Sequence, residues 1–346
     1  ERYSLLIAPK DPPDMVGRFS ELNNKALDPI NFWRYSTEQI NKVDFPFKNM
    51  RNDSVLNWRE VTSFIGENIL IPEDYIYINM VRPSDYHNNT TSGCASHNNY
   101  YKACLNALLE LIERDNIMRH WARGRPGVHI SISSLGKQIK KEVFSITSLG
   151  YDLKIINCSR FESIHTFIVL IINKAESRPK IAVASACSVD PRQAILKALD
   201  EAKGGLFISL VLEETTKPRI VKLKDLSDPR DHANYYRDPK NKKILNHYFN
   251  ASKVVNLNTC KSKYKNQDEK LLLKEILLNL KEKGVDVYFK DVTFGPFKNF
   301  GISVVRAISP QLIPLVFGAG MLKLEHEALG KIDYSPNGMY FPHPFA

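Results

Sequence analysis

Residues 91–121, TSGCASHNNYYKACLNALLELIERDNIMRHW, contain the pattern on which the fold assignment depends. From residue 100 onward the apolar residues recur at helical spacing, which predicts an amphipathic helix over residues 100–121. With Glu110 at the centre of one helix face, three neighbours lie beside it: Glu113, Arg114 and Ile117. The opposite side carries Leu105, Leu108 and Ile112. One face of this helix is therefore expected to hold two carboxylates and an arginine.

The residue types on this face suit phosphate chemistry. Carboxylates three residues apart on a helix can share a hard cation such as Mg²⁺, which takes few carboxylates together with phosphate oxygens. The adjacent Arg114 can bind a phosphate directly. The preceding small residues, Ser92-Gly93-Cys94-Ala95, let a backbone approach a ligand closely. The alternative is a solvated helix face, and the E-x-x-E-R pattern taken alone favours that alternative.

Composition limits the class of protein. The 346 residues are 43% hydrophobic and 25% charged, as in an average globular protein. The longest apolar stretch, residues 164–172, is far shorter than the roughly 20 residues that span a bilayer, so no membrane association is expected. Five scattered cysteines build neither a disulfide framework nor a zinc pattern, which favours a cytoplasmic location. The net charge of +10 has no accompanying nucleic-acid motif, so no nucleic-acid partner is expected.

Strand-like and helix-like segments alternate along the chain. Strands are expected over residues 75–81, 166–172, 180–185, 285–289 and 302–308, and further helices from residue 190 and over 268–283. Residues 1–60 are expected to be irregular, with Trp33 and Trp58 as core residues. Asp190 before a proline is typical of a helix start, and Gly284 of a helix end. The alternation predicts an α/β (mixed α+β) fold in one unit.

The common signatures of phosphate, zinc and hydrolase chemistry are absent from the sequence. It contains no Walker A loop, GxGxxG, HExxH or GxSxG motif.

Several separated segments, in the right order, resemble the YcaO family. Residues 91–121 resemble its second nucleotide-binding motif, a glycine-alanine turn and a helix bearing E-x-x-E-R. Residues 190–202, DPRQAILKALDEA, are similar to the third motif, in which a basic residue stands four positions before a glutamate. The tail FPHPFA at residues 341–346 resembles the proline-rich terminus of the azoline-forming branch. The resemblance implies one YcaO-type ATP-binding domain over residues 1–346.

The start of the chain also resembles part of a family motif. The first YcaO motif ends in E-x-x-E-R, and this sequence opens with Glu1-Arg2. The resemblance therefore implies a domain that lacks its N-terminal segment, which supplies a lysine, a serine and a first glutamate. An extended chain is expected to bind ATP more tightly.

The resemblance assigns ATP and Mg²⁺ contacts residue by residue. The carboxylates that match the Mg²⁺ ligands are Glu1, Glu110 and Glu113. The positions that match nucleotide contacts are Arg2, Ala95, Asn98, Arg114, Lys197 and Glu201. The tail residues expected to support cyclodehydration are Pro342 and Pro344, whereas His343 is expected to be exposed and inert.

Three residues depart from the family pattern. Lys197 stands where arginine is usual. Lysine keeps the positive charge but lacks the planar guanidinium that can donate two parallel hydrogen bonds to one phosphate. Lys102 stands where some members carry a nucleotide-contacting glutamate. Ala346 stands where the last proline of the PxPxP terminus is expected.

The implied function is ATP-dependent cyclodehydration of Cys, Ser or Thr residues in a ribosomally made precursor peptide, by phosphorylation of the backbone amide oxygen. The alternatives are backbone thioamidation, macrolactamidine formation, or a non-catalytic scaffold with the same fold. The implied partners are the precursor peptide and a ThiF-like, leader-binding protein. Three points stay open: whether a flavin dehydrogenase later oxidises the product, whether the chain forms a homodimer, and whether the product is a bacteriocin.

Overall fold

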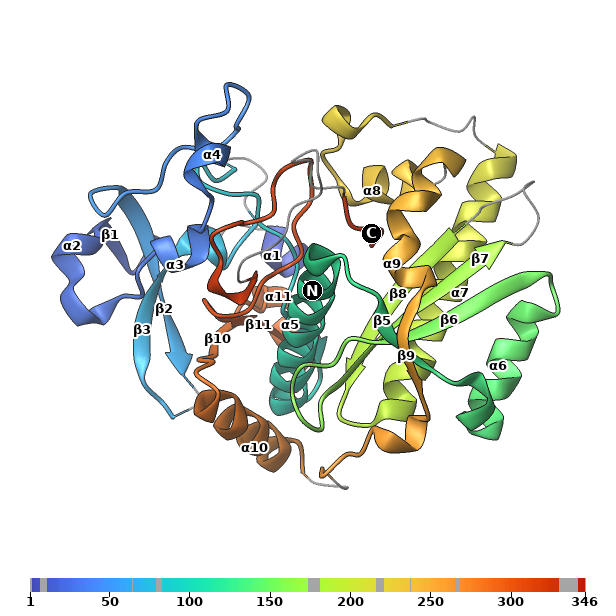
Figure 1. Cartoon of the computed structure of the whole chain (residues 1–346). Helices are drawn as coiled ribbons and strands as arrows, with labels where there is room; N and C mark the ends of the chain where they lie inside the picture. Colours follow the sequence, from blue (N-terminus) through green and yellow to red (C-terminus); the bar gives the residue numbers. More distant parts are fainter. Residues whose placement is uncertain are drawn as a thin grey trace. The chain divides into compact units, whose positions relative to one another are not determined.

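The computed structural model (Figure 1) describes residues 2–6, 11–63, 65–78, 83–173, 181–215, 221–236, 238–264, 268–329 and 342–345. The chain forms two compact units. Unit 1 contains Glu1–Asp115, Asn266–Val316 and Leu322–Lys331, and unit 2 contains Asn116–Lys265, Phe317–Met321 and Ile332–Ala346. The division falls inside helix α5 (Tyr100–Arg123), which begins in unit 1 and ends in unit 2. Each unit is built on one sheet with accompanying helices, which confirms the expected mixed α/β fold.

Unit 1 is built on an antiparallel sheet. The strand order is β1 (Met15–Arg18), β2 (Val55–Ser63), β10 (Tyr288–Asp291), β11 (Ser303–Ile308) and β4 (Cys94–His97), and β3 (Asn68–Pro72) also pairs with β2. Its other helices are α1 (Arg2–Leu6), α2 (Phe19–Leu22), α3 (Ile30–Trp33), α4 (Thr37–Ile40), α10 (Glu269–Glu282) and α11 (Gly295–Lys298). In Figure 1 the blue strand β2 lies beside the orange strand β10, so early and late parts of the sequence share one sheet.

The core of unit 1 explains why these early elements form. Trp58 on β2 is fully buried and its indole Nε1 donates to the Gly17 carbonyl on β1 at 3.0 Å. Trp33 is also buried. Both tryptophans therefore occupy the core, as the sequence predicted.

Unit 2 contains a second sheet. Its strand order is β8 (Ile181–Ser188), β7 (His165–Asn173), β6 (Tyr151–Asn157), β5 (Gly127–Ile130) and β9 (Ala251–Val255). Only the β5–β9 pair is parallel within these strands. Its helices are α6 (Lys137–Thr147), α7 (Pro191–Thr215), α8 (Pro229–Tyr235) and α9 (Asn246–Phe249), besides the end of α5.

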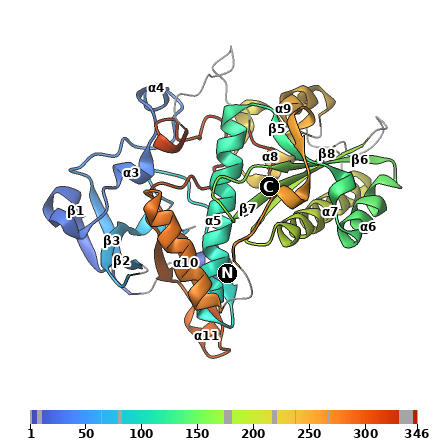
Figure 2. The ribbon, with the colours of Figure 1, turned by 60° about the horizontal axis from the view of Figure 1, so that its bottom comes forward.

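One face of the second sheet is covered by two helices. Figure 2 shows α6 and α7 against the same side of the sheet. The buried cluster there joins alternate residues of β6, β7 and β8 with the apolar sides of α6 and α7. Strand β7 is buried over His165–Ile172 on both faces, which explains its continuous run of apolar residues.

The helices with strong local signals form as expected. The helix predicted over residues 100–121 is confirmed as α5, and the helix predicted over 268–283 is α10. Asp268 caps α10 by accepting from the backbone N–H of Lys270 at 3.1 Å. Asp190 Oδ1 accepts from Arg192 N at 2.8 Å at the start of α7. Gly284 ends α10 with φ +71°, the left-handed conformation that favours glycine.

Two local predictions were wrong. The strand expected over residues 75–81 is absent from its described part: Glu73–Tyr75 is a 3₁₀ helix, and residues 76–78 belong to no strand. The Asn89 side chain donates to the carbonyls of Asp74 and Tyr77, which a strand partner would otherwise satisfy. Residues 1–60 are not irregular, because β1, α2, α3, α4 and most of β2 lie there. Most of these elements have only four residues, which is too short to show the hydrophobic periodicity from which helices and strands are predicted.

No helix within the described residues is both long enough and apolar enough to cross a membrane.

Candidate functional site

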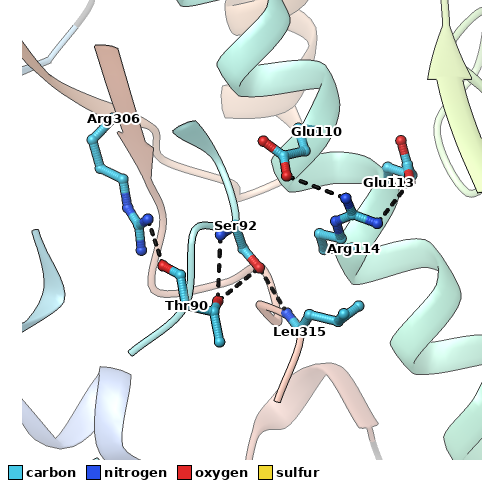
Figure 3. Close-up of polar contacts among 7 residues, drawn as sticks. All are labelled: Thr90, Ser92, Glu110, Glu113, Arg114, Arg306 and Leu315. Carbon is cyan, nitrogen blue, oxygen red and sulfur yellow. Dashed lines mark hydrogen bonds and ion pairs between the residues drawn. The ribbon is translucent and has the colours of Figure 1, made fainter. Parts of the chain in front are cut away.

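Helix α5 places three charged side chains together. Asn99 starts the helix, since its Oδ1 accepts from the backbone N–H of Lys102 at 3.1 Å. About four turns later, Arg114 donates from Nη2 to Glu110 Oε1 at 3.2 Å and from Nη1 to Glu113 Oε1 at 3.0 Å (Figure 3). One guanidinium therefore bridges the two carboxylates that the sequence singled out.

This group is largely withdrawn from water. Glu113 is only 7% exposed, and the side chains of Glu110 and Arg114 are 22% and 24% exposed. Ile117, expected on the same face, is fully buried. The face is therefore not a solvated one. Two carboxylates and one guanidinium carry a formal charge of −1, and low exposure strengthens the attraction of that charge for a cation.

The loop that follows β11 is tied to α5 and to the turn before β4. Asp115 on α5 is fully buried and accepts from the backbone N–H of Ile313 at 2.9 Å. Ser92 Oγ accepts from the backbone N–H of Leu315 at 3.1 Å and from the Thr90 hydroxyl at 2.9 Å (Figure 3). These bonds fix residues 90–92 and 313–315 around the part of α5 that carries Glu110.

Arg306 on β11 holds the same turn from the other side. Its Nη1 donates to the Thr90 carbonyl at 2.6 Å (Figure 3). Its Nη2 donates to Asn89 Oδ1 at 3.1 Å. The side chain is 4% exposed. Burial lowers the pKa of Arg306, while the charge of Glu110 acts in the opposite direction.

Gly93 permits the close packing of this turn. Its φ is +77°, and a Cβ at this position would lie 2.6 Å from the Ala307 carbonyl oxygen and 3.4 Å from Leu111 Cβ. The small residue expected to approach a ligand is thus required by the protein's own backbone. The contact with Leu111 also shows that β4 runs back along α5, so residues 92–93 lie level with Glu110.

Gly93→Ala is expected to lower the free energy of unfolding by about 3 kcal/mol, from left-handed strain plus the carbonyl clash. Urea denaturation measures this loss. Gly66→Ala is the matched control, because Gly66 has φ +85° and no atom within 4 Å of its added Cβ; it should cost only about 1 kcal/mol. Equal losses for the two variants would show that the clash at Ala307 contributes nothing.

The remaining residues assigned in unit 1 are more dispersed. Ala95 lies in β4 opposite Val305, and Asn98 is exposed between β4 and α5. Asn98 precedes α5, whose first residue lies about 15 Å from Glu110 along the helix axis. Arg2 is exposed on α1, and Glu1 lies outside the described residues. Lys102, a departure from the family pattern, lies 3.8 Å from the carboxylate of Glu269 on α10.

The third-motif residues belong to unit 2. Lys197 and Glu201 are exposed on one face of α7, four residues apart. Such a pair can present a cation and an anion to the same ligand. Their nucleotide contacts stay predictions, as do those of Ala95, Asn98 and Arg2.

The proline-rich tail is docked in unit 2. Residues 342–345, which include Pro342 and Pro344, are buried. The Tyr236 hydroxyl donates to the Pro342 carbonyl. His343 is 2% exposed, with its ring 4.5 Å from that of His232. The expectation of an exposed His343 was therefore wrong, because ring packing and backbone hydrogen bonds hold the tail. Phe341 and Ala346 lie outside the described residues.

His232 is the central anchor of this tail. The Gly318 backbone N–H donates to His232 Nε2 at 3.0 Å, so that nitrogen carries no proton. Nδ1 therefore carries the proton and donates to the His343 carbonyl at 3.0 Å. Burial lowers the pKa of His232 to about 4. The neutral ring thus keeps both hydrogen bonds at physiological pH.

The two carboxylates on α5 fit a Mg²⁺ ion that also binds phosphate. Among the described residues, no group of three or more His, Cys, Asp and Glu side chains is arranged to hold a metal. Glu110 and Glu113 provide two carboxylates, and the third assigned ligand, Glu1, is not described. Mg²⁺ usually takes one or two carboxylates and completes its shell with water and phosphate oxygens. The donor set is therefore adequate only together with a phosphorylated ligand.

Sequence reasoning missed the roles of Asp115 and Arg306. Asp115 offered a signal, since it falls on the apolar side of α5, where an unpaired carboxylate would be costly. Arg306 offered none, because its partners on residues 89–90 are 216 residues away in the chain.

Solved structures with the same fold include a heterocyclase and a microcin synthetase complex. The chain matches the structure of the heterocyclase TruD with a TM-score of 0.77 and 19% identity, over 99% of this chain and 49% of that one. It thus spans about half the length of that protein. It also matches the Escherichia coli microcin synthetase McbBCD complex with pro-MccB17 bound (TM-score 0.67, 15% identity, 100% and 85% covered).

A third match is YcaO from Methanopyrus kandleri bound with AMPPCP and Mg²⁺ (TM-score 0.66, 14% identity, 97% and 77% covered). Identities this low establish a shared fold. Comparison with curated protein sequences gives no match. The family model described as YcaO cyclodehydratase, ATP- and Mg²⁺-binding, matches residues 1–313. With most of its length matched by that model, this chain belongs to the YcaO family.

Proposed function

We propose that the chain is the ATP-using part of a peptide cyclodehydratase that converts Cys, Ser or Thr residues of a ribosomally made precursor into azolines. The observation that carries the proposal is the Glu110–Arg114–Glu113 group on α5. It combines a cation-binding pair of carboxylates with a guanidinium, in a place of low exposure.

The proposed reaction proceeds through an activated amide. The Cys, Ser or Thr side chain gives up its proton to solvent and attacks the carbonyl carbon of the preceding residue, which forms a C–S or C–O bond, closes the ring and leaves an oxyanion. That oxyanion attacks the γ-phosphorus of ATP, and ADP departs. The bond between the carbon and the phosphorylated oxygen then breaks with release of phosphate, the amide nitrogen loses its proton, and a C=N bond forms within the ring. The peptide thus loses one water for each ATP hydrolysed.

The protein's part in this chemistry is charge neutralisation and positioning. Glu110 and Glu113 would hold Mg²⁺, which neutralises phosphate charge as phosphoryl transfer proceeds. Arg114 would contact phosphate oxygens, since a planar guanidinium can donate two parallel hydrogen bonds to a phosphate. We further assign nucleotide contacts to Arg2, Ala95, Asn98, Lys197 and Glu201, and support of ring closure to Pro342 and Pro344.

The matched structures support this choice of substrate. One is a heterocyclase and another is a synthetase complex bound to a propeptide. A precursor peptide and a leader-binding partner protein are accordingly part of the proposal, since the matched synthetase is a complex with pro-MccB17 bound.

The test is reconstitution with a precursor peptide, the partner protein and Mg-ATP, followed by mass spectrometry of the peptide. The expected result is loss of one water's mass per modified residue, with release of ADP and phosphate in equal amounts and no change without ATP. Exchange of oxygen for sulfur in the peptide would instead identify a thioamide-forming enzyme. ATP-independent dehydration would contradict the proposal.

A further inference from the structure

Unit 1 contains a cavity that the proposed reaction does not use. Its volume is about 50 Å³, which is room for about three to five water molecules. Its polar wall includes Tyr75, His87, Arg306 and Lys323. The exposed Asn88 lies at its rim and provides a route to solvent. None of the described residues that line it is an aspartate or glutamate.

Lys323 is the most unusual residue of this wall, because it is a lysine with 4% exposure. Its Nζ donates to the Phe32 carbonyl at 2.5 Å and lies 5.4 Å from the centre of the Tyr75 ring and 5.9 Å from that of Tyr35. These contacts offset part of the cost of a buried cation. A buried cation without a counter-charge is nevertheless unfavourable.

The neighbouring polar atoms lack partners. His87 stacks on Tyr75 with ring centres 4.0 Å apart. Among the described residues, His87 Nε2, the Tyr75 hydroxyl and Arg306 Nε are buried without a hydrogen-bond partner. Buried polar groups almost always make hydrogen bonds, so several buried polar atoms without a hydrogen-bond partner around one cavity indicate that a bound group belongs there.

We propose that this cavity binds a small tetrahedral oxyanion of the phosphate or sulfate class. Lys323 and Arg306 supply positive charge, and the Tyr75 hydroxyl and the His87 ring supply the further hydrogen-bonding atoms. Four oxygens of such an ion match the size of the cavity and this number of donors. The site is separate from the acidic group on α5, which attracts cations. The inference does not depend on the proposed function, because anion binding is measurable without ATP or peptide.

The pH dependence follows from the groups around Lys323. Burial lowers the pKa of Lys323 to about 7, so its cationic form is present below that pH. Burial raises the pKa of both Tyr35 and Tyr75, which stay neutral. Burial and the charge of Lys323 lower the pKa of His87. Arg306 and His326 also line the cavity. Lys323 gains a proton as the pH falls through about 7, so oxyanion affinity should rise over this range.

Calorimetric titration of the protein with sodium sulfate tests the proposal. Sulfate keeps its charge over this pH range, whereas phosphate titrates, and sodium chloride corrects for ionic strength. One sulfate is expected to bind per chain. Lys323→Met, which keeps the volume and removes the charge, should weaken binding about 10- to 100-fold. Lys203→Met, at a partly exposed lysine paired with Glu142 and Asp200, is the matched control and should leave the affinity unchanged.

Two further measurements separate this site from others. Arg114→Gln should leave sulfate binding intact, so loss of binding in that variant would place the anion at the α5 site and overturn the proposal. Equal sulfate affinity in Lys323→Met and the unchanged protein would overturn it too. If Lys323→Met does not fold, the unchanged protein still decides the matter: equal affinities at pH 6 and pH 8.5 refute a site that depends on Lys323.

Discussion

Glu113→Gln is expected to lower ATP turnover by at least about 100-fold and to leave the fold intact. Loss of even an outer partner of a metal ligand typically costs 10- to 100-fold, and the proposal makes Glu113 a direct ligand. The glutamine keeps the shape of the side chain and can still accept from Arg114. It removes the negative charge that Mg²⁺ requires.

ADP release by the reconstituted enzyme, with precursor peptide and partner protein present, measures this effect. Glu142→Gln is the matched control, because Glu142 is also a helix carboxylate paired with a cation, Lys203 at 2.7 Å, but lies in the other unit. The control should retain full turnover. A Glu113→Gln enzyme with an unchanged melting temperature and undiminished ADP release would refute the assignment of the metal site to α5.

Removal of residues 341–346 is expected to abolish azoline formation while ATP binding largely survives. The family resemblance connects this terminus with cyclodehydration more than with nucleotide binding. The tail is held by definite contacts, since His232 and Tyr236 each donate to a tail carbonyl and Phe345 is 3% exposed. An ordered tail can position a group, whereas a disordered one cannot.

Mass spectrometry of the peptide and calorimetric titration with an ATP analogue separate the two effects. His232→Leu tests docking alone, because both prolines remain in the chain; it should reduce dehydration and leave nucleotide affinity unchanged. His129→Leu is its control, a buried histidine of the same unit that lies on β5. Dehydration at the full rate by the shortened chain would remove the tail from the mechanism.

The sequence by itself determined the helices, because each helix depends on interactions between residues that are close together in the chain. The helices α5, α7 and α10 were predictable because hydrogen bonds within a helix join residues four apart, and Asp190, Asp268 and Gly284 mark helix ends through their own backbone preferences. The grouping of Glu110, Glu113 and Arg114 was predictable for the same reason. Helical spacing alone brings their side chains within reach of one another.

Only the tertiary structure decided what depends on contacts between distant segments. Strand β2 pairs with β10, and β5 pairs in parallel with β9. A local sequence pattern can indicate a strand but cannot predict which other strand it will pair with. The requirement for glycine at residue 93 comes from the Ala307 carbonyl. The cavity brings His87 and Lys323 together, although each is an unremarkable polar residue in its own stretch of sequence. Burial, and hence the charge state of Lys323, is a property of the surroundings that folding assembles, and neighbours in sequence do not encode it.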